Sequence, residues 1–218
     1  MIQLFNVVKN YGSGKPALND VSLKIDKGEF VFLTGPSGAG KTTILKTLFG
    51  WERFDEGQVL VQGINVGKLD AGNIHTLRRS TGVIFQDYKL LPNKTVFENV
   101  AFAQEVTNHD RKKIKFKTWE ALKNVGLTPK KDSFPAQLSG GEQQRVAIAR
   151  AMVNTPPIIL ADEPTGNLDQ EISAEILKLF EEMNQNGATI VFATHSQDIL
   201  RPGKHRVIVL NRGEVVSS

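Results

Sequence analysis

The sequence contains no cysteine, which excludes disulfide bonds and any metal site that depends on thiolate ligands. It has no apolar run approaching the ~18 residues that a membrane-spanning helix needs. Residues 1–6 also lack the basic stretch and the apolar run of a secretory signal. These absences fit a protein of the reducing cytoplasm. If the protein acts at a membrane, we expect another chain to cross that membrane.

The composition is typical of one globular domain, because 40% of the 218 residues are hydrophobic and 23% are charged. The net charge of +4 permits an anionic partner but does not require one. Much of this excess lies in residues 111–117 (Arg-Lys-Lys-Ile-Lys-Phe-Lys), which we interpret as a solvated helix face. Contact of this segment with anionic lipid headgroups, or with nucleic acid, is left open as an alternative.

Strand-like and helix-like segments alternate, which indicates an α/β protein with a mostly parallel sheet. Between about residues 87 and 155 the pattern is mostly helical, and we interpret this part as a subdomain inserted into a core of residues 1–86 and 156–218. Alternating polar and apolar residues, or short apolar runs, predict strands at 2–8, 21–25, 29–34, 83–85, 157–161, 188–194 and 206–210. Helical spacing predicts helices at 41–49, 146–153 and 172–183, the last ending at Asn186 and Gly187.

A glycine-rich loop follows the predicted strand at 29–34 and precedes the helix at 41–49. It matches the phosphate-binding pattern G-x-x-x-x-G-K-[ST] in full. Its glycines let backbone N–H groups converge on a triphosphate, and the helix presents its positive N-terminal end to the anion. We assign nucleotide binding to Gly35, Pro36, Ser37, Gly38, Ala39, Gly40, Lys41, Thr42 and Thr43. Within this set, Lys41 supplies a charge near the β- and γ-phosphates, and the Thr42 hydroxyl is a candidate ligand of Mg²⁺.

Two carboxylates, Asp162 and Glu163, follow the apolar strand at 157–161. Ligands of parallel sheets bind at the carboxyl ends of the strands, so both side chains are expected beside the phosphate loop. Asp162 suits Mg²⁺, which prefers oxygen ligands, and Glu163 suits activation of the attacking water. In isolation an Asp-Glu pair would more often be a surface turn, and the preceding strand and the phosphate loop favour the catalytic interpretation.

A second helix N-terminus is predicted after residues 138–145, Leu-Ser-Gly-Gly-Glu-Gln-Gln-Arg, with Ser139 as its N-cap. Its bare glycine amides suit a second set of phosphate contacts. This octapeptide resembles the signature of the ABC ATPase family, and the other motifs of that family follow in order. The resemblance implies that Tyr11 stacks on adenine, that Gln86 reaches the metal and the attacking water, and that His195 contacts the γ-phosphate.

The same resemblance implies an ABC-type fold of the P-loop class, with an antiparallel N-terminal β region, and a homodimer that sandwiches two nucleotides. Each nucleotide would contact the phosphate loop of one copy and Ser139, Gly140, Gly141 and Glu142 of the other. Asn167 and Asp169 would lie in a loop that crosses the dimer interface. We therefore expect an Mg²⁺-dependent ATPase whose catalytic residues are Lys41, Gln86, Glu163 and His195.

Within the family, residues 32–42, 82–87 and 161–169 resemble the ATP-binding subunits of bacterial cell division, the FtsE type. This implies a separate membrane partner, FtsX, which would dock between Gln86 and Asn99, and a peripheral location on the inner face of the plasma membrane. An exporter ATPase for lipoproteins or macrolides is the alternative, and a non-catalytic ATP-gated scaffold is another. A nucleic-acid partner is not expected. Ser196 departs from the family pattern, which has Asp after the histidine.

Overall fold

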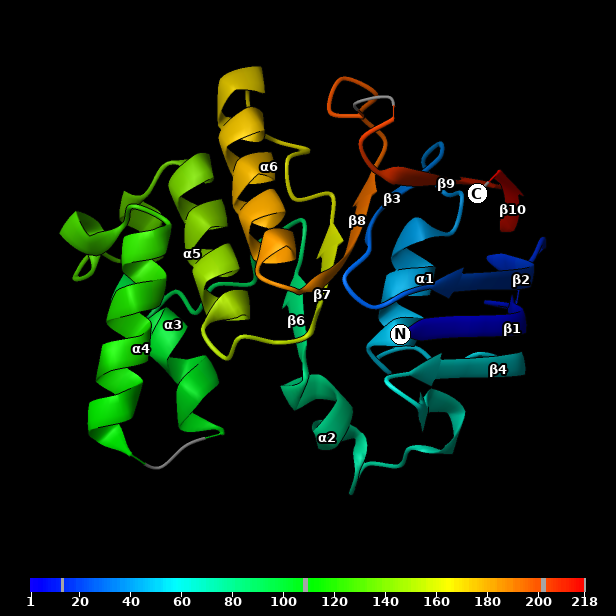
Figure 1. Ribbon diagram of the computed structural model, residues 1–218, viewed down its shortest axis with the longest axis horizontal. Helices are drawn as coiled ribbons and strands as arrows, with labels where there is room; N and C mark the ends of the chain where they lie inside the picture. Colours follow the sequence, from blue (N-terminus) through cyan, green and yellow to red (C-terminus); the bar gives the residue numbers. More distant parts are fainter. Residues whose placement is uncertain (13, 108–109, 201–202, 218) are drawn as a thin grey trace.

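The computed structural model describes residues 1–12, 14–107, 110–200 and 203–217, and contains two sheets (Figure 1). The larger sheet is parallel except for β10 at its edge, and its order is β10-β9-β3-β8-β7-β6. Its strands are β3 (Phe30–Thr34), β6 (Thr81–Ile84), β7 (Ile158–Asp162), β8 (Thr189–Thr194), β9 (Arg206–Asn211) and β10 (Glu214–Ser217). Every residue of β3 and β8 is buried, as expected for central strands of a parallel sheet.

The smaller sheet is antiparallel and has the order β2-β1-β4-β5. Its strands are β1 (Ile2–Lys9), β2 (Leu18–Ile25), β4 (Glu56–Val61) and β5 (Ile64–Asn65). Helix α1 (Lys41–Leu48) lies between the two sheets, because its buried Ile44, Leu45 and Leu48 belong to a core that both sheets share. This packing fixes the helix whose first residue is the candidate phosphate-binding lysine.

The helices α3 (Val96–Glu105), α4 (Arg111–Asn124) and α5 (Gly140–Met152) lie together on one side of the molecule, where the inserted subdomain is predicted (Figure 1). The 3₁₀ turns η2 (Thr128–Lys130) and η3 (Pro135–Gln137) link α4 to α5. The boundaries of that subdomain at about 87 and 155 stay a prediction. None of the described helices is long and apolar enough to span a bilayer.

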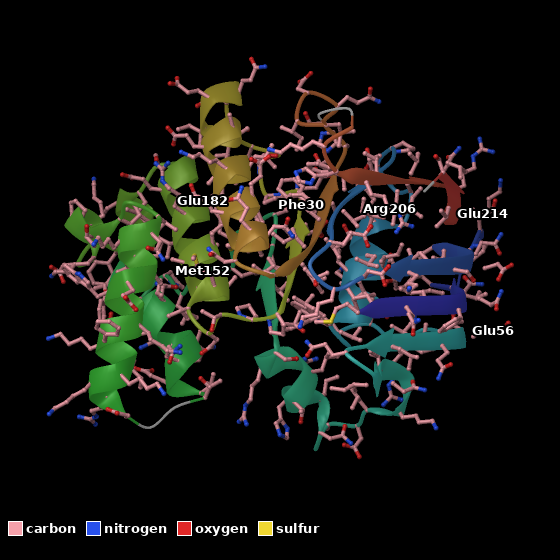
Figure 2. The ribbon with its side chains drawn as sticks, in the orientation of Figure 1. Phe30, Glu56, Met152, Glu182, Arg206 and Glu214 are labelled. Carbon is pink, nitrogen blue, oxygen red and sulfur yellow. The ribbon has the colours of Figure 1, made fainter. Side chains whose placement is uncertain are left out.

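Helix α6 (Gln170–Gln185) covers the other face of the large sheet. Asp169 caps its first turn by accepting a hydrogen bond from the Ile172 N–H at 2.9 Å. Its buried Phe180 meets Phe192 of β8 edge to face, with ring centroids 5.0 Å apart. Phe30, labelled near the middle of Figure 2, stacks on the same aromatic group. These rings form the centre of the second core.

The sequence predicted many of these elements within a few residues, but it missed β4, β5, β10, the turn η1 (Val66–Lys68) and the short helix α2 (Ile74–Arg79), and it gave no bounds for α3 and α4. The predicted helix at 146–153 is wrong at its start, because α5 begins directly after Ser139. Ser139 and Glu142 form a reciprocal capping box, in which each side chain accepts a hydrogen bond from the backbone N–H of the other residue. Gly140 and Gly141 therefore belong to the first turn of α5.

Replacing Phe180 by Ala should lower the free energy of unfolding by about 3–5 kcal/mol, because the ring is fully buried and its removal leaves a cavity. Urea unfolding of the ligand-free protein measures this change. Phe5→Ala is the matched control, since Phe5 is exposed, and should shift stability by no more than about 0.5 kcal/mol. Equal losses for both variants would contradict the described core.

Candidate active site

Residues 35–40 form a loop between the end of β3 and the start of α1, and two of its glycines cannot be replaced without displacing backbone. Gly35 has a φ of 146°, and a Cβ there would lie 2.1 Å from the Leu210 carbonyl oxygen. Gly40 has a φ of 106°, and its Cβ would lie 2.6 Å from the Ala17 oxygen. The loop is therefore held tightly against β9 and the start of β2, which gives its backbone N–H groups a fixed direction.

The Lys41 side chain lies inside this loop and is almost fully buried. Its Nζ donates to the carbonyl oxygens of Gly35 at 2.8 Å and Pro36 at 3.3 Å. The same nitrogen lies 3.5 Å from Glu163 Oε1. A buried ammonium requires such partners, and together they place its charge between the loop and the carboxylate that follows β7.

Thr42 and Asp162 meet across the site. The Thr42 hydroxyl donates to Asp162 Oδ1 at 3.1 Å. Burial raises the pKa of Asp162, the hydrogen bond from Thr42 opposes that shift, and the charge of Glu163 adds to it. Two adjacent carboxylates and a hydroxyl offer the oxygen ligands that Mg²⁺ prefers, and a cation there would relieve the repulsion between the acids.

Glu163 has a left-handed backbone with a φ of 47°, and its N–H donates to the Ala193 oxygen at 3.0 Å. This conformation directs the carboxylate toward the end of β8. There its Oε2 accepts a hydrogen bond from the His195 N–H at 3.2 Å and lies 2.9 Å from His195 Nδ1. Lys41 and His195 thus hold the Glu163 carboxylate from two sides.

These groups face a pocket of about 540 Å³. The pocket brings together the phosphate-loop residues from Ser37 to Thr43 with three other predicted site residues and with Ala17, which the sequence did not single out. Those three residues are Gln86, Glu163 and His195. The methyl side chain of Ala17 gives no sequence signal for a binding site, so only its position beside Gly40 in the structure shows that it lines the pocket.

Gly35, Pro36 and Asp162 do not line this pocket, although Asp162 accepts a hydrogen bond from Thr42, which does. Further predicted site residues also lie outside it. Tyr11 is 55% exposed, and Lys9 Nζ lies 5.0 Å from its ring centroid. Asn167 and Asp169 are exposed, with Asp169 acting as the cap of α6. Ser139 and Glu142 form the N-terminus of α5, and Gly140 and Gly141 belong to its first turn. Within one chain, therefore, the phosphate loop and the signature residues form two separate surfaces.

Known proteins are similar to this chain in sequence and in fold. The ABC transporter family model matches residues 18–166. The chain belongs to this family. Curated relatives named cell division ATP-binding protein FtsE, from Streptococcus pneumoniae and Escherichia coli, are 50% and 45% identical over 99% of this chain and over 94% and 97% of their own lengths.

A dimeric ATP-binding cassette, MJ0796, solved in a post-hydrolysis state with ADP and Pi, is also similar. It matches 100% of this chain with a TM-score of 0.92 and 39% identity, over 97% of its own length. These similarities confirm the predicted ABC-type fold class, the resemblance to FtsE and the prediction of an ABC-type ATPase. The roles of individual site residues stay predictions.

One polar contact of this ABC ATPase was missed from the sequence. Arg150, near the end of α5, donates to the carbonyl oxygens of Tyr88 and Lys89, both at 2.7 Å. Those two residues have left-handed backbones, with φ of 57° and 49°. Burial lowers the pKa of the Arg150 guanidinium from its usual value. The segment after Gln86 is thereby fastened to the signature helix.

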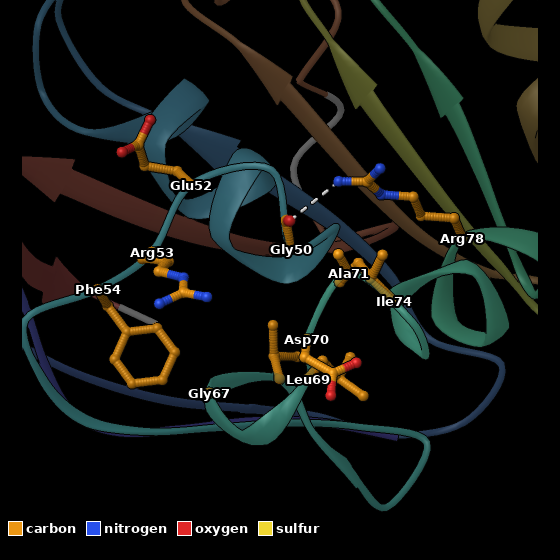
Figure 3. A pocket seen from close by; sticks show the side chains of 11 residues that line it. Gly50, Glu52, Arg53, Phe54, Gly67, Leu69, Asp70, Ala71, Ile74 and Arg78 are labelled. Carbon is orange, nitrogen blue, oxygen red and sulfur yellow. Dashed lines mark hydrogen bonds between the residues drawn. The ribbon is translucent and has the colours of Figure 1, made fainter.

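A groove of about 740 Å³ lies beyond this segment, lined by α2, by the end of α3 and by residues before and after Gln86. Its aromatic residues include Trp51, Phe85 and Phe102. Figure 3 shows an adjoining pocket of about 510 Å³, which shares Ala71, Ile74 and Arg78 with the groove. There the Arg78 guanidinium donates to the Gly50 oxygen at 3.1 Å (Figure 3).

The predicted docking stretch between Gln86 and Asn99 needs correction at its second half. Asn99 is fully buried, and its amide bonds to backbone atoms of Leu91, Lys94 and Thr95. Val96 is fully buried as well. These residues build the turn before α3. Within the stretch, only Lys89 and Leu91 line the groove, and the rest of its wall comes from α2, α3, β6, α5 and the loops between them.

Replacing Asp162 by Asn should stabilise the nucleotide-free, metal-free protein at neutral pH. A raised pKa means that the ionised carboxyl costs free energy in the folded chain, and this cost disappears as the pH falls toward the usual value of 3.8. The gain in Tm of Asp162→Asn over the unchanged protein should therefore grow between about pH 4 and pH 7. Thermal unfolding in EDTA measures it.

Asp198→Asn is the control, since Asp198 is an exposed acid near the same edge. Its Tm difference should stay near zero over the same pH range. If Asp162→Asn loses stability as the pH rises, the buried carboxylate is stabilising and the assigned environment is wrong.

Proposed function

We propose that two copies of this chain hydrolyse ATP in two shared sites, each closed by the phosphate loop of one copy and the α5 N-terminus of the other. The observation that supports this most directly is the separation of these two surfaces within one chain. A nucleotide on the phosphate loop alone would leave its terminal phosphate facing water. The first N–H groups of a helix lack intrahelical partners, so the N-terminus of α5 can bind the exposed side of that phosphate.

In this proposal, Glu163 accepts a proton from the water that attacks the γ-phosphorus, while the bond to the leaving ADP oxygen breaks. Lys41 turns from its loop carbonyls to the β- and γ-phosphates, and His195 orients Glu163 and contacts the γ-phosphate. Thr42, Asp162 and Gln86 would hold Mg²⁺, which neutralises phosphate charge. Tyr11 supplies a ring face for adenine, since its side chain is exposed.

The partner copy contributes Ser139, Gly140, Gly141 and Glu142 to each site, and Asn167 and Asp169 lie beside the interface. Supporting this assembly, the similar cassette MJ0796 is a dimer. A resident Ser139–Glu142 capping box keeps the α5 N-terminus ordered before the second copy arrives. Closing the dimer therefore requires little local refolding, and loss of the γ-phosphate removes the group that both copies bind.

Replacing Glu163 by Gln should lower ATP turnover by about 10²–10⁴-fold, because the amide cannot accept the proton from water. ATP still binds, so the variant should accumulate as a nucleotide-bound dimer. Phosphate release and light scattering with Mg-ATP measure the two effects. Glu182→Gln on exposed α6 is the matched control and should keep normal turnover. A Glu163→Gln protein that turns over ATP normally, or stays monomeric with ATP, would refute the proposed site.

We further propose that the ATPase gates a membrane protein of the FtsX type in bacterial cell division, from the cytoplasmic face of the membrane. The support is the FtsE name of relatives that align over nearly the whole chain. The docking surface is the groove that contains Trp51, Phe85 and Phe102, whose apolar walls suit a short partner helix. Because Arg150 fastens the adjoining loop to α5, the groove and the signature surface move together.

Replacing Phe102 by Ala should abolish co-purification with FtsX after co-expression, since it removes an exposed ring from the groove wall. Turnover by the isolated variant should stay normal, because Phe102 lies outside the nucleotide pocket. Phe134→Ala removes a ring of nearly equal exposure elsewhere and should leave co-purification intact. Capture of FtsX by the Phe102→Ala protein at normal yield would place the docking surface elsewhere.

A further inference from the structure

Helix α4 has an aromatic outer face that its packing does not explain. Phe116 is 61% exposed and Trp119 is 45% exposed, although Thr118, Ala121 and Leu122 bury the opposite face. One exposed ring is ordinary on a protein surface, whereas two rings three positions apart on a helix lie side by side and form one apolar strip. Neither ring takes part in binding nucleotide or in lining the groove.

Basic side chains surround this strip. The basic residues of α4 are Arg111, Lys112, Lys113, Lys115, Lys117 and Lys123, against a single acid, Glu120. Among the described residues, no ion pair joins any of these cations to a carboxylate. The helix, which begins after the capping acid Asp110, therefore carries a local excess of positive charge.

The spacing places lysine stems beside the rings. Lys112, Phe116, Trp119 and Lys123 are separated by four, three and four positions, so they share one side of the helix, which we call the α4 outer face. Lysine can extend its charge past apolar neighbours to an anionic layer, and aromatic rings favour the polar boundary of a bilayer. Protein interfaces, by contrast, are depleted in lysine. The combination fits an anionic lipid surface better than a protein groove.

The position of α4 agrees with this partner. Its first turn lies at the lower edge of the molecule in Figure 1, together with α2 and the end of α3, and nitrogen-tipped side chains project from that part of α4 in Figure 2. The same edge contains His75, Arg78 and Arg79 of α2, which line the docking groove. A bilayer that contains a partner bound in this groove would therefore face the basic residues of α2 as well as those of α4.

We propose that the α4 outer face binds an anionic phospholipid surface, with Phe116 and Trp119 at the level of the headgroups and the lysines on lipid phosphates. This contact is separate from ATP hydrolysis and from the membrane partner, because none of its residues lies in the nucleotide pocket or the groove. The chain itself then binds the membrane surface, through the charge of the lysines and through the apolar surface of the two rings.

Sedimentation with vesicles tests the proposal on the isolated full chain. Binding is expected to vesicles of phosphatidylcholine mixed with phosphatidylglycerol, and not to phosphatidylcholine alone. It should weaken between about 0.15 and 1 M salt, because screening reduces the attraction between exposed charges. The double variant Phe116→Ala/Trp119→Ala should lose roughly tenfold in affinity, as should Lys112→Glu/Lys123→Glu.

Matched controls are Phe5→Ala/Phe134→Ala for the rings and Lys27→Glu/Lys178→Glu for the charges, all exposed residues on other elements. These should bind the mixed vesicles like the unchanged protein. Folding of every variant is checked by its thermal shift with Mg-ATP, which the α4 outer face does not affect. Equal losses in the α4 and control variants would overturn the proposal, since they would indicate attraction by net charge or exposed rings alone.

Fluorescence gives an independent measurement, because the chain has only two tryptophans. In Trp51→Phe protein the emission comes from Trp119, and it should shift to shorter wavelength with phosphatidylglycerol vesicles and stay unchanged with phosphatidylcholine vesicles. Vesicle binding without this shift would overturn the assigned face. Binding of a short DNA duplex that depends on the same side chains, with no vesicle binding, would identify a nucleic-acid surface instead.

Discussion

The active site depends on holding opposite charges close together at the carboxyl edge of the large sheet. Lys41 begins helix α1 after β3, Asp162 ends β7, and Glu163 follows it. Both strands pair with β8, which fixes the separation of these side chains. The Lys41 ammonium donates to two loop carbonyls and lies beside the Glu163 carboxylate. Asp162 accepts a hydrogen bond from the Thr42 hydroxyl, but burial still raises its pKa above the usual value. The folded chain therefore disfavours the ionised form of Asp162, which a metal ion bound with a triphosphate would stabilise.

Close backbone packing makes this arrangement possible. The phosphate loop lies against the ends of β9 and the segment before β2, so closely that Gly35 and Gly40 leave no room for a Cβ. The two sheets and α1 share one core, which prevents the loop from relaxing away from these contacts. The antiparallel sheet thus supports the catalytic loop, although it supplies few of the pocket's side chains itself.

Sequence reasoning succeeded where a local pattern has one structural solution. The phosphate loop, the apolar strand before Asp162 and the amphipathic helix after Asp169 each combine a motif with a matching periodicity. It failed for β4 and α2, because α2 has only six residues and β4 begins with three exposed positions. It also misjudged Asn99, whose burial comes from a turn that its own side chain closes. Contacts such as Arg150 with Tyr88 join distant segments, and one sequence contains no signal for them.

Helix α5 has a mechanical consequence for the whole molecule. Its thirteen residues form a rod about 20 Å long, with the signature residues at one end and Arg150 near the other. The guanidinium fork binds two successive carbonyls, so it resists both sliding and twisting of the attached segment. Because α5 is one continuous helix, a tilt of its N-terminus also displaces Arg150 and the segment to which Arg150 is bonded. The α5 N-terminus and the segment after Gln86 are thus connected through one continuous helix and two hydrogen bonds.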